Sequence, residues 1–308
     1  MENGVHKKIE TLYDVQNAVN RKIQKGYYVL GGVHKKVYEL SAGAVVTYDG
    51  EHELLADVTV SGVVYTPLRC KKTGTLTTPV PLQYWICGGG GKGGASATTG
   101  PYGGGSGGGG GYVNSGSVAA GTHSVSIGSG NGGTTRIGST SATGGGAATV
   151  VQDSAQSKGG NGGSGGGGSG AATSAFSQAG TGAGVSTYPF GVTSLRAHCP
   201  GGGGAFMTDV SNGSGVQGGE GGSNGSAGSK ATASNSSSGT GGAGGAYGGG
   251  KGGGVKSGSV TAASSGSFYG AGGGGGVTYS SSKKTAPGSG YQGVAYFLLP
   301  KDVQFVAG

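Results

Sequence analysis

After residue 87 the sequence changes abruptly to glycine. Only eight of the 81 glycines lie in residues 1–87, so about one residue in three is glycine from there to the end of the 308-residue chain. Hydrophobic residues make up 33% of the whole and charged residues 10%, which is too little apolar material for an ordinary core throughout. The glycine-rich part must therefore pack largely without side chains or remain unfolded.

The glycine runs do not have the pattern of collagen. The runs 107–111 and 272–276 lack a strict three-residue register, and the chain has only eight prolines. Polyglycine can instead form an extended helix of three residues per turn, in which missing Cβ atoms let neighbouring backbones hydrogen-bond to one another. Ordering each residue costs about 1–2 kcal/mol and each bond contributes about 1 kcal/mol, so the bonds must be nearly complete. We expect a mostly β fold with glycine-rich, polyglycine II-type packing.

Two apolar runs bracket this region. LQYWIC (82–87) precedes the first glycine block, and QGVAYFLL (292–299) follows the last one. Both carry apolar residues on both faces of a period-two pattern, which indicates central strands covered on both sides. If they meet in one sheet, residues 82–308 form one glycine-rich domain after an N-terminal domain of residues 1–81. Short strands are also expected at Tyr112-Val113, HSVSIGS (123–129) and GGTTRIGS (132–139).

The first 81 residues predict a small α+β or mostly β domain, with a role in attachment or oligomerisation. Apolar residues near helical spacing predict an amphipathic helix over 9–25 that ends at Gly26. YYVL and VHKKVYEL flank Gly31-Gly32 as a hairpin, and AVVTY and DVTVSGVVY supply further strands. Because such a domain is marginal alone, we expect a homo-oligomer, most simply a trimer, held through this region.

Several kinds of site are not expected. The net charge is +8, but the basic residues after residue 87 lie mostly singly, unlike the arginine-rich and aromatic pattern of nucleic-acid binders; they are Lys92, Arg136, Lys158, Arg196, Lys230, Lys251, Lys256, Lys283, Lys284 and Lys301. Cys70, Cys87 and Cys199 have no metal-ligand spacing and are expected free and buried. The five histidines are dispersed, so we expect no metal and no cofactor.

Enzymatic activity is also not expected. Only four acidic residues follow residue 87, namely Asp153, Asp209, Glu220 and Asp302, which argues against a paired-carboxylate glycosidase in this part. GSGNGG (128–133) fits a dinucleotide-binding glycine pattern but lacks the strand-then-helix context, and GAYGGGKGG (245–253) has Gly252 where a phosphate loop needs Ser or Thr. Neither glycine pattern predicts a nucleotide site.

The ordered set of motifs resembles a known family. YWICGGGGKGG, then GGGGGYVNSGSVAAGTHSVSIGSGNGGTTRIGSTSATGGG, then repeated glycine blocks and GYQGVAYFLLP resemble the glycine-rich domains of bacteriophage and prophage tail proteins over about residues 82–300. More distantly the region is similar to tail-fibre adhesins in which a polyglycine II sandwich carries receptor-contacting loops. Residues 1–81 do not follow the adhesin pattern.

The resemblance implies a virion structural protein: a tail-fibre or tail-tip adhesin that binds the host cell surface through loops on a glycine-rich frame. Its partners would be other tail proteins and a host glycan or surface protein, and its location the virion, after synthesis in the host cytoplasm and release by lysis, since the N-terminus has no signal-peptide pattern. Rigid aromatic side chains in the interruptions are candidates for receptor contact: Tyr102, Tyr188, Phe190, Tyr247, Phe268 and Tyr269. Phe176 and Phe206 are expected to be buried. The alternatives are a non-adhesive baseplate, collar or capsid-fibre component and, less favoured, a bacterial surface matrix protein.

Overall fold

The fold is mostly β, as expected. The computed structural model describes residues 13–16, 19–22, 25–30, 33–39, 44–95, 103–149, 159–162, 167, 179–182, 186–205, 207–209, 214–229, 232–234, 239–256, 258–280 and 282–308. Strands account for 37% of the chain, and no described helix reaches seven residues. The only helical turns in the described residues are two short 3-10 turns, so the functional features rest on strands, turns and glycine segments.

The N-terminal strands form two hairpins, which corrects the helix expected over 9–25. β1 (Tyr13–Gln16) pairs antiparallel with β2 (Val19–Lys22), and β3 (Lys25–Leu30) pairs with β4 (Val33–Glu39) about the expected Gly31-Gly32 connection. The sequence Tyr-Asp-Val-Gln of β1 alternates with period two, and this pattern prevails over the looser helical spacing. Gly26 lies at a register shift within β3 instead of ending a helix.

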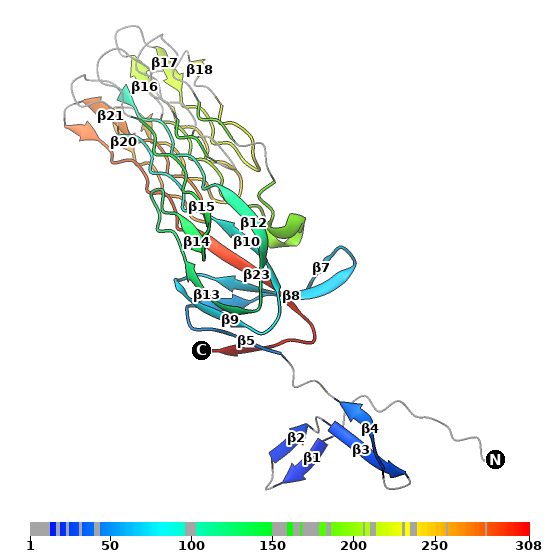
Figure 1. Cartoon of the computed structure of the whole chain (residues 1–308). Coiled ribbons are helices and arrows are strands. Elements are labelled where there is room, and N and C mark those ends of the chain that lie inside the picture. Colours follow the sequence, from blue (N-terminus) through cyan, green and yellow to red (C-terminus); the bar gives the residue numbers. More distant parts are fainter. Residues whose placement is uncertain are drawn as a thin grey trace.

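One antiparallel sheet, hereafter the bracket sheet, joins the two ends of the glycine-rich region. Its strand order is β12 (Val113–Val118), β10 (Leu82–Cys87), β23 (Val294–Pro300), β8 (Val63–Cys70) and β6 (His52–Leu54), with β7 (Val58–Val60) also paired to β8. β10 pairs with β23 from Gln83↔Leu298 to Cys87↔Val294. The expected closure of the two apolar runs in one sheet is therefore confirmed (Figure 1).

A second sheet packs against the bracket sheet. Its order is β15 (Thr140–Ala142), β14 (Thr135–Ile137), β13 (Gly121–Ser126), β9 (Gly74–Thr78), β5 (Val45–Tyr48) and β24 (Gln304–Ala307). β13 and β14 confirm the strands expected at HSVSIGS and GGTTRIGS. β8 pairs with β23 and β9 pairs with β13, so both sheets include strands from each side of residue 81. The domain boundary expected after residue 81 therefore lies between strands that pair with one another in the same two sheets.

The apolar core lies between these sheets, and β10 and β23 are buried on their other faces as well. Leu82, Ile86 and Phe297 from the bracket sheet meet Leu76 and Val125 from the second sheet in one buried cluster. Alternate residues of the same strands, Trp85, Cys87, Val294 and Tyr296, belong to a separate buried cluster on the opposite face. This confirms that the two bracketing strands are covered on both sides. Cys70, Cys87 and Cys199 are free and buried, as expected.

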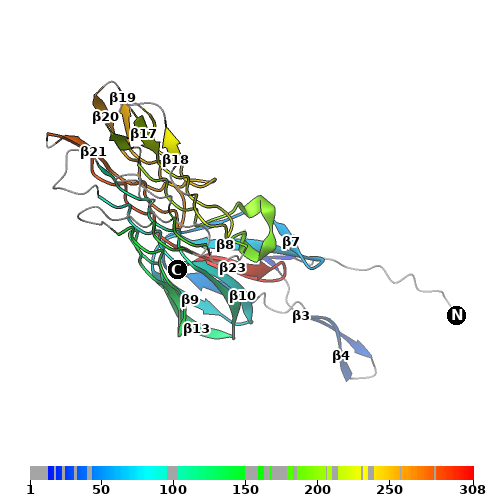
Figure 2. The same ribbon diagram turned by 90° about the horizontal axis from the view of Figure 1, so that it is seen from above.

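The glycine segments run side by side away from the sheets and hydrogen-bond through their backbones (Figures 1 and 2). The N–H groups of Gly105, Gly108 and Gly111 donate to the carbonyls of Gly276, Gly273 and Gly270 in turn. Those of residues 88, 91 and 94 donate in the same way to residues 112, 109 and 106. Partners therefore recur every third residue, in contrast to the period of two that relates side chains on one face of a β-strand.

This close packing leaves no room for a Cβ at many of the glycines inside the array. A Cβ at Gly109 would lie 2.1 Å from the carbonyl oxygen of Asn161, and one at Gly242 would lie 2.1 Å from that of Gly219. Non-glycine residues within the segments, such as Lys92, Ala243 and Lys251, are exposed. The interior of the array is thus mostly backbone against backbone, and of its side chains the small ones of Ser106, Ala205 and Ala271 are buried within it.

Short sheets occur at the end of the array opposite β5 and β24 (Figure 1). They comprise β16 (Met207–Asp209), β17 (Ser214–Gln217) and β18 (Thr232–Ser234); β19 (Gly254–Lys256) and β20 (Ser259–Thr261); and β11 (Gly103–Gly104), β21 (Val277–Ser280) and β22 (Lys283–Lys284). The interruptions of the glycine pattern therefore supply hairpin strands at this end.

Candidate functional site

Residues 186–199, hereafter the crossing segment, pass over the face of the bracket sheet that points away from the main core. The segment contains two 3-10 turns, Pro189–Gly191 and Thr193–Leu195. Phe190 packs against the clusters around Trp85 and Leu298, and Leu195 packs with Val58. These apolar contacts fix the segment on the sheet, with one cavity on each side of it.

The backbone of the crossing segment is unusual for side-chain-bearing residues. Phe190, Arg196 and Cys199 have φ values of 53°, 59° and 59°, in the left-handed region that non-glycine residues seldom adopt. Such conformations cost of order 1–3 kcal/mol each and persist only where surrounding contacts hold them. The segment is therefore held in one shape by its packing, which suits a rigid binding surface.

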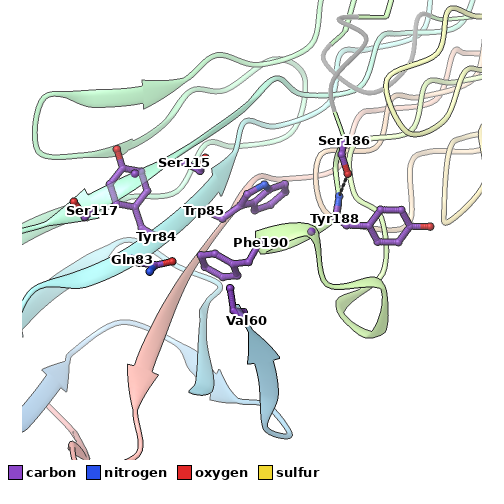
Figure 3. A pocket seen from close by; sticks show the side chains of 11 residues that line it. Val60, Gln83, Tyr84, Trp85, Ser115, Ser117, Ser186, Tyr188 and Phe190 are labelled. Carbon is purple, nitrogen blue, oxygen red and sulfur yellow. Dashed lines mark hydrogen bonds between the residues drawn. The ribbon is translucent and has the colours of Figure 1, made fainter. Parts of the chain in front are cut away.

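The first cavity, hereafter the aromatic groove, has a volume of about 590 Å³ (Figure 3). Gln83 and Trp85 of β10 and their cross-strand partners Ser117 and Ser115 of β12 line one side. Tyr188 and Phe190 of the crossing segment line the other. The groove combines ring surfaces with an amide and two hydroxyls, which can both donate and accept hydrogen bonds. These groups could fix the orientation of a polar ring-shaped ligand.

The structure brings together some of the aromatic residues expected to contact a receptor. Tyr188 and Phe190 are half-buried and share the aromatic groove. A side-chain hydrogen bond with Tyr247 raises the pKa of Tyr188, so Tyr247, whose surface is 49% exposed, lies beside this site. Tyr102, Phe176 and Phe206 lie outside the described residues.

Phe268 and Tyr269, by contrast, do not line the aromatic groove. Tyr269 is only 9% exposed and belongs to the buried cluster of Trp85 and Tyr296, so it contributes mainly to packing. Phe268 is half-buried, packs against the same cluster and lines the second cavity. Sequence reasoning grouped these two residues with Tyr188, and the fold separates their roles.

The second cavity, hereafter the arginine cavity, has a volume of about 430 Å³ on the other side of the crossing segment. Arg69 of β8 and Arg196 of the crossing segment both line it, together with Leu55, Val58, Ser194 and Phe268. Nothing in the sequence pairs Arg69 with Arg196, because they are brought together by the fold. The same holds for Gln83 and Trp85 in the aromatic groove, although Trp85 is the only tryptophan of the chain.

A buried chain of polar groups lies beneath the arginine cavity. Nδ1 of His198 is 3.0 Å from the carbonyl oxygen of Arg196, and its Nε2 is 2.9 Å from the hydroxyl of Tyr296. Since a carbonyl can only accept, Nδ1 carries the proton, and Nε2 accepts from Tyr296. Burial lowers the pKa of His198 to about 3, so the ring is neutral near pH 7.

Arg69 continues this chain from the neighbouring strand. Arg69 and Tyr296 are cross-strand partners in β8 and β23, and the Arg69 guanidinium lies 5.5 Å from the ring centroid of Tyr269. Burial raises the pKa of the Tyr296 hydroxyl, while the charge of Arg69 and a hydrogen bond from it act in the opposite direction. The polar chain therefore links Arg69 to the backbone that carries Arg196.

Ion pairs surround Arg69 on its solvent side. Arg69 and Lys71 both pair with Glu53, and Lys71 also lies 3.9 Å from Glu51. Hydrogen bonds from Arg69 and Lys71 lower the pKa of Glu53. Arg196 is exposed, and no carboxylate of the described residues lies within ion-pairing distance of it. Among the described residues, therefore, no carboxylate balances the charge of Arg196 at the cavity.

Grouped metal ligands and membrane-spanning helices are both absent from the described part of the chain. Within that part, no three His, Cys, Asp or Glu side chains are grouped as a metal site would need, and no helix is long and apolar enough to cross a membrane. Comparison of the sequence with models of protein families and with curated proteins finds no match.

Proposed function

We propose that the chain is a structural protein of a phage virion, namely a tail-fibre or tail-tip adhesin that binds the host cell surface. In this proposal the glycine segments form a polyglycine II-type frame, and the segments between them carry recognition. Its partners are other tail proteins and a host glycan or surface protein. The observation that carries the proposal is the three-residue recurrence of backbone hydrogen bonds between glycine segments.

The recurrence supports a frame of threefold helices. A polyglycine II helix has three residues per turn, so a given neighbour faces the same backbone position in every turn. Gly105, Gly108 and Gly111 meet the segment 270–276 in this way, and Gly202 and Ala205 meet Gly108 and Gly105. Such a frame is fixed by backbone bonds and depends little on what its connections contain, which is favourable where connections must vary to bind different surfaces.

The aromatic groove supports a binding role. Its walls belong to rigid elements, since Trp85 and Gln83 lie on a central strand and Phe190 is held by packing on two clusters. Rigid aromatic rings provide contact area at little entropic cost, and the neighbouring Ser115, Ser117 and Gln83 supply polar contacts. We assign host contact to this groove and to Tyr247 beside it.

A non-adhesive virion component remains the second candidate. The glycine array supports this reading as well as the first, because a body stiffened by backbone hydrogen bonds is equally suited to a baseplate, collar or capsid fibre. A bacterial surface matrix protein is the less favoured third reading. The adhesin and the non-adhesive component differ in their position on the virion and in whether the purified protein binds host cells.

Immunogold labelling of intact virions tests the proposal. An antibody against this chain is expected to mark the distal end of the tail or its fibres, and the purified protein is expected to bind intact host cells and to compete with virion adsorption. Labelling of the baseplate, collar or capsid without cell binding would favour the non-adhesive reading. Absence from purified virions would contradict both virion roles.

A further inference from the structure

We propose that the arginine cavity is a second binding site, which takes the carboxylate of an acidic saccharide. This inference rests on the proposed adhesin function, because it names the chemistry of a ligand on the host surface. The cavity is separated from the aromatic groove by the crossing segment, and its volume of about 430 Å³ lies within the range of small-ligand sites, about 300–1,000 Å³.

The charges around the cavity select a single negative charge. The charges of Arg69 and Lys71 are balanced by those of Glu53 and Glu51. Asp57, on the β6–β7 connection, is paired with Lys301. Arg196 adds one positive charge that the described carboxylates do not balance. One surplus charge suits a carboxylate better than a doubly charged phosphate. The planar guanidinium of Arg196 can bind a carboxylate through two parallel hydrogen bonds.

The remaining lining suits a sugar ring. Phe268 offers a half-exposed aromatic ring, and Ser194 offers a hydroxyl that can donate to or accept from a sugar hydroxyl. Leu55 and Val58 give the opposite wall an apolar surface. Recognition of an anion by charge alone does not require an aromatic or apolar wall. An acidic sugar, in contrast, presents a carboxylate, hydroxyls and an apolar ring face together.

The polar chain beneath the cavity holds the site in position before the ligand arrives. His198 donates to the carbonyl of Arg196, whose φ of 59° is otherwise unfavourable, and accepts from Tyr296. The Thr193 carbonyl accepts from the Arg196 N–H at 3.1 Å. Because the backbone of Arg196 is fixed from both sides, binding needs to order only its side chain, which lowers the entropic cost of recognition.

Saturation-transfer NMR with the purified full-length chain tests the inference. The probes are D-glucuronate, D-galacturonate, N-acetylneuraminate and 3-deoxy-D-manno-octulosonate, each beside its neutral methyl ester, with inorganic phosphate as a competitor. At least one carboxylate is expected to bind, at least tenfold more tightly than its ester. Arg196→Gln is expected to weaken that binding at least tenfold, and Arg196→Lys to weaken it less. Arg136→Gln, an exposed arginine on β14, is expected to leave it unchanged.

Each outcome decides the inference. Failure of all four carboxylates to bind, equal binding of the esters, or unchanged binding by Arg196→Gln in a chain with the wild-type melting temperature would overturn it. Preferential displacement by millimolar phosphate would assign the cavity to phosphate instead and overturn the saccharide assignment. These results are independent of the adhesin proposal, which depends on virion labelling and cell binding. If labelling places the protein at the tail tip but none of the probes binds the arginine cavity, only the saccharide inference fails.

Discussion

Nε2 of His198 accepts a hydrogen bond from the hydroxyl of Tyr296 at 2.9 Å, across 98 residues of sequence and at the centre of a buried aromatic cluster. The ring of His198 also lies within 5.2 Å of Trp85 and 4.9 Å of Phe268, measured between ring centroids. This pair ties the crossing segment to the central strand β23. The positions of both cavities therefore depend on it.

Removing the Tyr296 hydroxyl is expected to destabilise the fold. Tyr296→Phe removes the hydrogen bond that the Tyr296 hydroxyl donates to Nε2 of the buried His198, and loss of such a bond costs about 0.5–1.5 kcal/mol. Tyr65→Phe, at a half-buried tyrosine of β8 that makes no side-chain hydrogen bond with the described residues, is the matched control and is expected to change the free energy of unfolding by less than about 0.5 kcal/mol. Urea denaturation of both variants measures the difference. Equal stability of the two variants would show that the pair contributes nothing.

Stability is expected to fall in mild acid because of His198. Its pKa is lowered by burial to about 3 in the folded chain and is about 6.5 when unfolded. The unfolded state therefore binds the extra proton first, so the contribution is complete above pH 6.5 and is lost as the pH falls from 6.5 toward 3. The loss amounts to roughly 3 kcal/mol at pH 4.5, at 1.36 kcal/mol for each pH unit.

His198→Gln separates this effect from that of carboxylates such as Glu53, whose lowered pKa acts in the same direction. The free energy of unfolding is measured between pH 7 and pH 4.5 for both proteins. Over this interval the wild type is expected to lose more stability than the variant. The difference in slope corresponds to about one proton that the wild type takes up on unfolding. Parallel curves would contradict the buried, neutral histidine.

Glycines inside the array are expected to be intolerant of side chains, whereas rim positions tolerate them. Gly242→Val places a branched side chain where a Cβ already lies 2.1 Å from a carbonyl oxygen, while Ala243→Val enlarges an exposed side chain in the same segment. Gly242→Val and Gly109→Val should fail to fold or lose several kcal/mol, and Ala243→Val should change stability by less than about 0.5 kcal/mol. Thermal unfolding and soluble yield compare them. Comparable behaviour of Gly242→Val and Ala243→Val would rule out backbone-to-backbone packing.

Order in the glycine region is expected to be measurable by amide exchange and proteolysis. Residues 88–290 should resist protease, and donors such as Gly105, Gly108 and Gly111 should exchange slowly because their N–H groups bond to a neighbouring segment. The exposed Lys92 and Lys251 provide trypsin sites within the segments. Random-coil exchange throughout the region, or rapid cleavage after both lysines, would be incompatible with this packing.

Assembly is expected to be oligomeric, most simply trimeric, through residues 1–81. Light scattering over a concentration series should give the mass of a trimer, and thermal stability should fall on dilution. A variant that lacks the first 43 residues, where β1 to β4 lie, should lose assembly and keep both sandwich sheets. A monomeric full-length chain with concentration-independent stability would contradict the expectation.

Sequence reasoning was most successful where the signal is local or unusually strong. The double-faced apolar runs predicted β10 and β23, and the glycine pair predicted the β3–β4 hairpin. The helix over 9–25 was wrong, because a few apolar residues at loose helical spacing also fit two short strands. The cavities could not be predicted, since Arg69 and Arg196 or Trp85 and Phe190 meet only through long-range packing of the crossing segment.

Adsorption of virions that carry Tyr188→Ala and Phe190→Ala is the most direct test of host binding by this chain. Phe190→Ala removes ring surface from the aromatic groove and Tyr188→Ala removes the ring beside it, which points away from the groove toward the exterior (Figure 3), without altering a packed glycine; Arg136→Ala on the second sheet serves as the control. Virions with the double variant should assemble with normal protein content, and the purified variant should stay folded, yet adsorption to host cells should fall at least tenfold while control virions adsorb normally. Normal adsorption by the double variant would contradict the groove assignment, and if adsorption also survives deletion of every loop between Gly159 and Gly276, the adhesin account itself fails.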